Sequence, residues 1–296
     1  MKDDMGRSGS VRGRRLGVVI TGGTGGLGRA MAREFLRAGD KVVICGRDVA
    51  RLESALRALR ADVPDGEVYA MACDVSDPGQ ASTFTAFAAS KIGIIDRWIN
   101  NAGSAGNRRR PLWELDPSDI DETCRTNLSG SMILCAEALK VMREQPAGNS
   151  VPSYHIFNMG FSLAGVRSSP TSVPHRASKR AVALTSALIR NELKVAQIHS
   201  IGIHELSPGL VMTGLLLRDA SARQRRFFNA VAETPETVAT VLVPLIRRIR
   251  GYGGTLRYMP VIMMLLKLLA SNFGYRKDRF FDSEGRRRPS PGDKVS

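Results

Sequence analysis

Cysteine is scarce in this chain. Its four cysteines, Cys45, Cys73, Cys124 and Cys135, lie in apolar contexts and form no CxxC pair. This spacing argues against a zinc site and against a disulfide framework. The sequence therefore predicts a protein of a reducing compartment, without a bound metal.

Long apolar runs are also missing. No run reaches the roughly 18 to 20 apolar residues that a bilayer-spanning helix needs, so we expect a soluble or peripheral protein. The opening Met1 to Arg15 is polar and basic, lacks the apolar core of a secretory signal, and makes a poor organelle transit peptide. We expect residues 1–14 to form a disordered basic arm and the last dozen residues a disordered tail.

Acidic residues are outnumbered: 28 Asp and Glu face 43 Lys and Arg, a formal net charge of +15. Such an excess suits nucleic acid, an anionic membrane surface or an anionic small molecule. Part of it lies in runs at Arg12–Arg15, Arg108–Arg110 and Arg286–Arg288, which a solvated surface also explains. No recognised nucleic-acid motif accompanies the charge, so nucleic acid is not an expected partner.

Short apolar runs alternate with helix-length segments from Leu16 onward. Strands that are apolar throughout, and separated in this way, indicate a parallel sheet covered on both faces. We predict an α/β fold, a doubly wound parallel sheet in a single Rossmann-type domain over residues 15–250. The expected strands are Leu16–Ile20, Lys41–Cys45, Glu67–Cys73, Arg97–Asn100, Tyr154–Asn158 and His199–Glu205; the expected helices include Gly28–Ala38, Pro117–Met142 with Asp116 as N-cap, and Ala177–Val195.

The alternation stops after about Ile249. Residues 251–296 are expected to form a C-terminal extension with a short apolar helix at Val261–Ala270, interrupted by Lys267. That helix is too short to cross a bilayer. It could pack on the domain edge or lie on a membrane surface.

A glycine-rich turn, Thr21-Gly22-Gly23-Thr24-Gly25-Gly26-Leu27-Gly28, follows the first strand and opens a helix. In that context glycines let the backbone approach a pyrophosphate, and the helix N-terminus supplies amide donors. The turn therefore predicts a dinucleotide site.

The residues after the second and third strands indicate which dinucleotide binds. An NAD site usually carries an acid there for the ribose hydroxyls, whereas this chain has Arg47, which can pair with a ribose phosphate. NADP(H) is therefore favoured over NAD(H), although Asp48 leaves NAD open. Asp74 could accept from the adenine amine, or it could be an N-cap or turn residue.

The spacing TGxxxGxG, together with Asn100-Asn101-Ala102-Gly103, resembles the short-chain dehydrogenase/reductase family from about Leu16 to Ile249. The resemblance implies a nicotinamide-dependent oxidoreductase whose active site is an Asn, Ser, Tyr, Lys tetrad. Asn127, Ser162 and Lys179 match the asparagine, serine and lysine. The implied cofactor-binding residues, besides Arg47 and Asp74, are Thr21, Gly22, Gly26, Leu27, Gly28, Asn101, Ala102, Gly103, Lys179, Pro208, Gly209 and Thr213.

The tetrad tyrosine is replaced. His175 stands four residues before Lys179 and thirteen after Ser162, the position that the family pattern gives to tyrosine. An imidazolium could donate the proton that the phenol normally donates, since its ordinary pKa of about 6.5 suits proton transfer near neutrality. Lys179 would disfavour that protonated form, and the ring reaches less far. His175 is thus either catalytic or a noncatalytic residue of a degenerate site.

Within the family the chain resembles the chlorophyll b reductases most. The likeness rests on His155-Ile156-Phe157-Asn158-Met159, Trp98 to Gly103 with the following Arg110-Pro111-Leu112, Leu206 to Val211, and Pro235 to Pro244. Two features depart from it: Gly160-Phe161-Ser162-Leu163 replaces an acidic, glycine-rich run, and the tyrosine is lost.

This resemblance implies NADPH-dependent reduction of the 7-formyl group of chlorophyll b or chlorophyllide b, in the chloroplast and peripheral to the thylakoid membrane. Other hypotheses stay open: a catalytically impaired NADPH-binding partner subunit, or a reductase of another carbonyl compound. Peripheral membrane contact is expected through Leu215–Leu217 and Val261–Ala270, which could also be cleft or core residues. A homo- or hetero-oligomer is expected because the helices Pro117–Met142 and Ala177–Val195 resemble those that pair subunits in the family.

Overall fold

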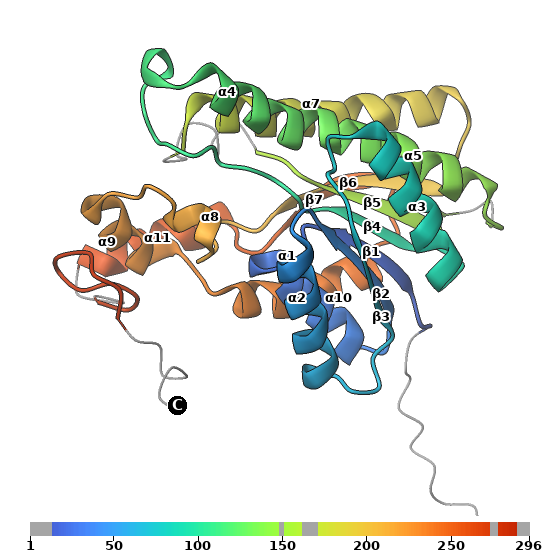
Figure 1. Cartoon of the computed structure of the whole chain (residues 1–296), viewed down its shortest axis with the longest axis horizontal. Coiled ribbons are helices and arrows are strands. Elements are labelled where there is room, and N and C mark those ends of the chain that lie inside the picture. The colour runs from blue at the N-terminus through green and yellow to red at the C-terminus, as the bar shows by residue number, and fades with distance from the viewer. Residues whose placement is uncertain (1–13, 148–150, 162–170, 273–277, 289–296) are drawn as a thin grey trace, which may run out of the picture.

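The computed structural model describes residues 14–147, 151–161, 171–272 and 278–288. Its centre is a parallel sheet of seven strands in the order β3-β2-β1-β4-β5-β6-β7 (Figure 1). The strands are β1 (Gly17–Thr21), β2 (Lys41–Gly46), β3 (Val68–Ala72), β4 (Arg97–Asn100), β5 (Tyr154–Met159), β6 (Ile201–Ser207) and β7 (Gly253–Arg257). The central strands are buried along their whole length, which explains their unbroken apolar runs.

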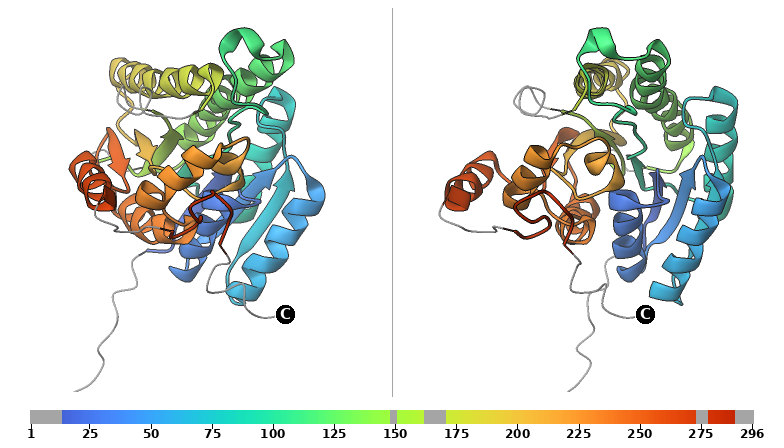
Figure 2. Two further views of the ribbon diagram at one scale, coloured as in Figure 1. Left: turned by 90° about the vertical axis from the view of Figure 1, so that its left-hand side faces the viewer. Right: turned by 60° about the vertical axis from the view of Figure 1, so that its left-hand side comes forward.

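Helices cover both faces of the sheet (Figures 1 and 2). One face packs against α1 (Gly26–Arg37), α2 (Val49–Asp62) and α10 (Pro235–Arg248); the other packs against α3 (Pro78–Ile92), α5 (Gly130–Glu144) and α7 (Val173–Val195). Two large apolar clusters fill the layers between helices and sheet. The predicted doubly wound fold is confirmed.

Two segments differ from the expected element bounds in ways that matter for the site. The segment expected as one helix, Pro117–Met142, consists of α4 (Pro117–Cys124) and α5, joined by a π-helical turn at Arg125–Ser129. The expected N-cap Asp116 accepts a hydrogen bond from Ser118 N at 2.8 Å. Helix α7 begins at Val173, four residues earlier than predicted, because Pro174 suits a first helical turn. His175 and Lys179 therefore share one helix face, one turn apart.

The sheet continues beyond residue 250, where the sequence predicts the end of the reductase domain. Strand β7 pairs with β6 from Ile203↔Gly253 to Ser207↔Arg257. No strand was predicted there, because Gly253 and Gly254 read as a loop. Pairing with β6 makes the strand.

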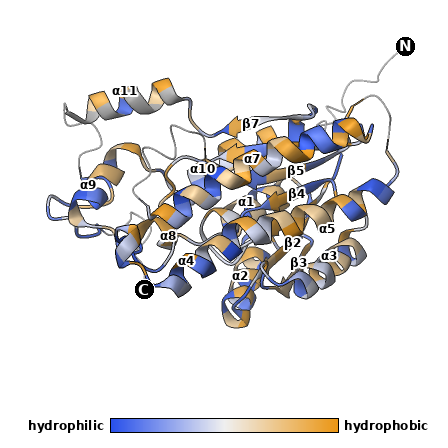
Figure 3. Ribbon diagram, turned by 90° about the horizontal axis from the view of Figure 1, so that it is seen from above, coloured by the Kyte–Doolittle hydropathy of each residue, from blue (hydrophilic) through white to orange (hydrophobic). Residues whose placement is uncertain are grey.

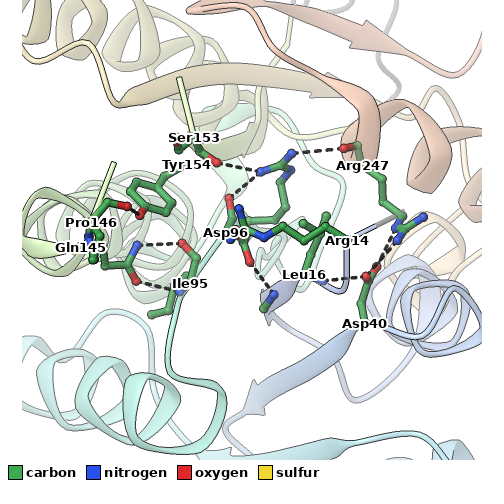
Figure 4. A network of polar contacts seen from close by, with 12 residues as sticks. Arg14, Leu16, Asp40, Ile95, Asp96, Gln145, Pro146, Ser153, Tyr154 and Arg247 are labelled. Atoms are coloured by element: carbon green, nitrogen blue, oxygen red, sulfur yellow. Dashed lines mark hydrogen bonds and ion pairs between the residues drawn. The ribbon is translucent and has the colours of Figure 1, made fainter. Parts of the chain in front are cut away.

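A polar network secures the amino-terminal edge of the sheet (Figure 4). Asp96 accepts from Arg14 Nη2 at 2.7 Å and from Gly17 N at 2.8 Å. Asp40 accepts from Leu16 N at 3.0 Å and from Arg247 Nε at 2.8 Å. These buried carboxylates tie the start of β1 to the ends of other elements, so the edge opposite the strands' carboxyl ends is firmly held.

The C-terminal extension packs on two helices that follow β6, α8 (Gly214–Leu217) and α9 (Ala222–Val231). Phe281 is 1% exposed in an apolar cluster with Leu216 and Phe228. Asn229 Oδ1 accepts from Phe280 N and Phe281 N, at 2.8 and 3.0 Å. Residues 278–288 are thus part of the folded structure.

Helix α11 (Val261–Asn272) lies at the periphery, beside α9 (Figure 3). Its Lys267 pairs with the buried Glu233 at 2.8 Å, while Ile262 and Leu269 are 65% and 60% exposed. Among the described helices, none combines the length and the apolar character needed to cross a membrane.

Candidate active site

A cavity of about 750 Å³ opens at the carboxyl edge of the sheet. Such an edge is where ligands bind in open α/β sheets. The predicted residues that line it are Gly22, Gly26, Leu27, Arg47, Asn101, Ala102, Gly103, His175, Lys179, Pro208, Gly209 and Thr213. The fold therefore brings residues from five separate segments of the chain into one site.

The glycine-rich turn forms one end of this cavity. Gly22 and Gly26 have φ of +67° and +52°, which favour glycine. A Cβ on Gly28 would lie 2.3 Å from Gly22 O, so Gly28 allows the close packing of turn and helix without lining the cavity. The N-cap of α1 is Gly25, which has no side chain to occupy the first amides. This cradle fits a pyrophosphate.

Thr21 connects the glycine-rich turn to the segment that follows β4. Its buried Oγ1 accepts from Asn101 N at 3.1 Å and Ala102 N at 3.0 Å, and Asn101 Nδ2 donates to Thr21 O at 2.9 Å. Thr21 is therefore a structural link between the ends of β1 and β4, one layer behind the cavity wall.

Arg47 lies at the end of β2 and is 54% exposed, with its Nη1 3.1 Å from Glu122 Oε1. Arg51, which the sequence analysis missed, also lines the cavity and lies near Gly25. The Asp48 carboxylate accepts from Arg51 N at 2.9 Å as the N-cap of α2. The cap uses Oδ1 of Asp48, and Asp48 lines this end of the cavity together with the guanidinium groups of Arg47 and Arg51.

Asp74 sits between the lining residues Cys73 and Val75. Its Oδ1 accepts from Ser76 N at 2.9 Å and Ser76 Oγ at 2.8 Å. The geometry is that of a turn aspartate, as one of the two interpretations had it. Contact with adenine stays a prediction.

The segment after β6 forms another wall, and its Thr213 side chain lies against Gly26 of the glycine-rich turn. Gly209 has φ of +72°, and Thr213 caps α8 by accepting from Leu216 N at 3.3 Å. Leu215, Leu216 and Arg218 follow on the wall. The segment thus lines the cavity from Pro208 to Arg218.

His175 is 4% exposed and lines the cavity. Its Nδ1 lies 2.7 Å from Ser104 O, and its ring packs edge-on against Phe161 with centroids 5.5 Å apart. Burial, followed by the charge of Lys179, lowers the pKa of His175 to about 4. The ring is therefore neutral at physiological pH.

Asn127 lies behind His175, fully buried in the π-helical turn. Its Oδ1 accepts from Ser104 N at 2.8 Å, while its Nδ2 donates to Ser104 O at 2.9 Å and to Ser178 Oγ at 3.0 Å. Asn127 thus does not line the cavity itself. It fixes the Ser104 peptide that does.

Lys179 is 6% exposed, with its Nζ close to Gly103. Burial lowers the pKa of Lys179 to about 8, so the ammonium form still prevails at neutral pH. Ser162, the fourth predicted catalytic residue, lies outside the described residues.

Sequence reasoning missed Thr24, Arg51, Ser104 and Phe161, all of which line the cavity. Arg51 lies in the first turn of α2, whereas Arg47 precedes the N-cap Asp48, so the role of Arg51 depends on where that helix begins. Ser104 takes part through its backbone, which side-chain identity does not signal.

The family described as short chain dehydrogenase matches residues 17–224. This chain belongs to the short-chain dehydrogenase family. As a member it is an oxidoreductase that uses a nicotinamide cofactor, and the cradle at Gly22–Gly28 fits that cofactor.

Curated family members include close relatives. Chlorophyll(ide) b reductase NOL of Oryza sativa subsp. japonica is 40% identical over 233 residues, which cover 78% of this chain and 66% of that protein. Probable chlorophyll(ide) b reductase NYC1 of the same organism is 36% identical over 284 residues, covering 91% and 54%. This chain thus spans about two thirds of the first relative and about half of the second.

Among solved family structures, levodione reductase aligns with a TM-score of 0.68 and 25% identity, over 82% of this chain and 96% of that one. The architecture is therefore shared well beyond the glycine-rich turn.

Proposed function

We propose that this chain reduces the 7-formyl group of chlorophyll b or chlorophyllide b to a hydroxymethyl group with NADPH. The observation that carries this proposal is the similarity to chlorophyll(ide) b reductases, which at 36% identity extends over 91% of the chain. It includes the segments after β6 that form the substrate side of the cavity. A similarity confined to the nucleotide half would support the family alone.

The lining of the cavity beyond the nucleotide end supports an apolar substrate. Its apolar residues come from β5, β6, α8 and the segments that follow β5 and β6, and include Met159, Phe161, Leu206, Leu210, Leu215 and Leu216. These side chains fit a largely apolar macrocycle and exclude water from the reacting carbonyl.

The proposed roles of the polar groups follow from their positions. The bound nicotinamide supplies the hydride. Lys179, buried beside Gly103, would hold the ribose; His175, facing the cavity, would exchange the proton of the substrate oxygen; Asn127 would keep the Ser104 peptide in place. Ser162 would orient the carbonyl, as the family pattern implies.

NADPH is proposed over NADH because Arg47 and Arg51 both face the end of the cavity next to Gly25 and Gly46. A ribose phosphate would bind between two guanidinium groups, which suit phosphate geometry. Asp48 is engaged at the N-terminus of α2, so it opposes the phosphate less than a free carboxylate would.

The test is pigment conversion by the purified protein with NADPH, followed by chromatography of the products. We expect hydroxymethyl product from wild type and a loss of at least 100-fold in His175→Ala. Absence of product from chlorophyll b, from chlorophyllide b and from small aldehydes would refute the proposal.

One observation favours a second candidate, a cofactor-binding partner subunit without turnover. The neutral, buried His175 lacks the acidity of an ordinary proton donor. Under this hypothesis NADPH would raise the melting temperature by linkage, while turnover would begin only in His175→Tyr. Robust wild-type activity would exclude it.

We also propose chloroplast localisation, peripheral to the thylakoid membrane, with α11 as the contact. Ile262, Met263, Leu266 and Leu269 of this helix are 47% to 65% exposed, and the chain is basic. Sedimentation with vesicles of anionic lipid tests it: serine at Ile262, Leu266 and Leu269 should weaken binding, and unchanged binding would refute the role of α11.

An oligomer is proposed through α7, where Leu184, Leu188 and Val195 are 56%, 57% and 78% exposed. Exposed apolar side chains in a row on one long helix are typical of a subunit interface. Light scattering should give a dimer or larger species for wild type and a monomer for Leu184→Glu. A monomeric wild type would refute the proposal.

A further inference from the structure

The hydrogen bond to Ser104 determines which nitrogen of His175 carries a proton. A backbone carbonyl oxygen only accepts, so at a separation of 2.7 Å the Nδ1 of His175 must be the donor. That carbonyl also accepts from Asn127 Nδ2 at 2.9 Å, and Ser104 N donates to Asn127 Oδ1 at 2.8 Å. The fully buried Asn127 therefore holds the Ser104 peptide on both sides.

A neutral imidazole carries one proton, so the other ring nitrogen has a lone pair. With Nδ1 protonated, Nε2 is the acceptor, and it has no hydrogen-bond partner within the described part of the chain. The side chain lines the cavity. Nε2 is thus the ring atom available to a substrate oxygen, and it can give a proton only from the imidazolium form.

Burial and the charged groups around the ring oppose that imidazolium form, and the hydrogen bond to Ser104 O only partly offsets them. Lys179, one turn further along α7, and Arg109, from the loop between β4 and α4, are the charged groups that act on it, and both are cationic. Phe161 covers a ring edge. No carboxylate of the described residues comes within ion-pair distance of the imidazole.

The geometry points to a catalytic His175 whose resting form is a proton acceptor at Nε2, with Ser104 O as the positioning group that selects this nitrogen. At neutral pH the site is then set for removal of a proton from an alcohol, and carbonyl reduction uses only the imidazolium fraction. This inference rests on the proposed function, because it takes His175 as the group that exchanges the substrate proton.

The reaction balances as R–CHO + NADPH + H⁺ ⇌ R–CH₂OH + NADP⁺. In oxidation the O–H proton of the alcohol goes to Nε2 and the hydride of the carbinol carbon goes to the oxidised cofactor. In reduction the carbonyl carbon gains the hydride, and its oxygen takes the proton of the imidazolium at Nε2. The proton then returns to the ring from solvent.

Equilibrium requires that kcat/KM for reduction divided by kcat/KM for oxidation fall tenfold per pH unit, because reduction consumes one proton. Equilibrium does not determine whether kcat/KM for reduction falls or kcat/KM for oxidation rises as the pH increases. A phenol has an ordinary pKa of about 10, and although Lys179 lowers it, the phenol keeps its proton to a higher pH than this imidazole does. Until the phenol ionises, reduction is flat and oxidation rises with pH. With a neutral His175, reduction falls with pH and oxidation is flat.

The experiment measures kcat/KM in both directions from pH 5.5 to 7.5, below the pKa of Lys179, with chlorophyllide b and its 7-hydroxymethyl product. For wild type we expect reduction to fall about 100-fold across the two pH units and oxidation to stay constant. His175→Tyr is the matched control and should show the opposite: flat reduction and rising oxidation. Flat reduction in wild type would overturn the inference.

A second measurement needs no turnover. In a histidine ¹⁵N-labelled protein at pH 7, His175 should show a protonated Nδ1 and an unprotonated Nε2, with and without NADPH. His175→Ala identifies the resonances, and Asn127→Ala should shift the ring towards a mixture of tautomers. A protonated Nε2 in wild type would refute the assignment. The expected tautomer without pigment turnover would instead refute the proposed reaction.

Discussion

Removal of the Arg47 side chain should weaken the binding of NADPH and leave the binding of NADH almost unchanged. A hydrogen bond to a charged group contributes about 1.5 to 3 kcal/mol. Since Arg47 is 54% exposed, the lower end applies. A loss of about 1.5 kcal/mol weakens NADPH roughly tenfold in Arg47→Ala, by the standard conversion of free energy to affinity. NADH has no ribose phosphate, so its Kd should change less than about twofold.

Removal of the Glu122 charge should have the opposite effect and strengthen the binding of NADPH. Its Oε1 lies 3.1 Å from Arg47 Nη1, and the two side chains are 47% and 54% exposed. An exposed ion pair is worth about 0.2 to 1 kcal/mol, which a phosphate must replace when it binds Arg47. Glu122→Gln should therefore tighten NADPH by roughly 1.5- to 5-fold, with NADH unaffected.

The assay is calorimetric or fluorescence titration of each variant with NADPH and NADH at low and high salt. Arg57→Ala is the control, because this arginine lies on α2, is 72% exposed and pairs with Glu53. Its affinities should match those of wild type. Equal losses for NADPH and NADH in Arg47→Ala, or weaker NADPH binding in Glu122→Gln, would show that the phosphate does not bind at this end of the cavity.

Three further predictions concern stability, each measured by denaturant or thermal unfolding. Asp40→Ala leaves Leu16 N and Arg247 without their buried acceptor and should lower the free energy of unfolding by about 3 kcal/mol. Asp62 is half exposed, so Asp62→Ala should lower it by less than about 0.5 kcal/mol. Equal effects would contradict the network of Figure 4. Burial lowers the pKa of His155 to about 2 and the pKa of His204 to about 4. The unfolded state therefore takes up protons first as the pH falls below about 6.5, and the free energy of unfolding should drop towards pH 4 by about 1.4 kcal/mol per pH unit for each histidine. A flat stability profile over this range would refute the prediction. Phe281→Ala should cost about 3 kcal/mol because the ring is fully buried on α9, and a neutral effect would mean that the extension does not pack there.

Much of the nucleotide half could be predicted from the sequence because its determinants are local. A glycine-rich turn between an apolar strand and a helix has one common structural outcome, and strand β4 appears at the predicted Arg97–Asn100. Strand β7 could not be predicted: its glycines carry no strand signal, and only pairing with β6 orders them.

The candidate site was predictable in its side chains and not in its backbone. The family spacing identified His175, Lys179 and Asn127, yet it could not show that Asn127 and His175 meet at the carbonyl of Ser104, since a backbone acceptor exists at every position. Arg51 was overlooked because its role depends on where α2 begins. The meeting of Asn127 and His175 at Ser104, and the position of Arg51, both follow from the three-dimensional structure and not from the residue types alone.

Hydride transfer to a pigment formyl group in this cavity can be followed directly with isotope-labelled cofactor. Wild-type protein is incubated with chlorophyllide b and NADPH deuterated at both C4 positions, and the pigment is analysed by mass spectrometry. We expect a hydroxymethyl product that carries one deuterium on the new carbinol carbon, and a strong loss of that product in His175→Ala. A product without deuterium, or no product from the wild type, would contradict it.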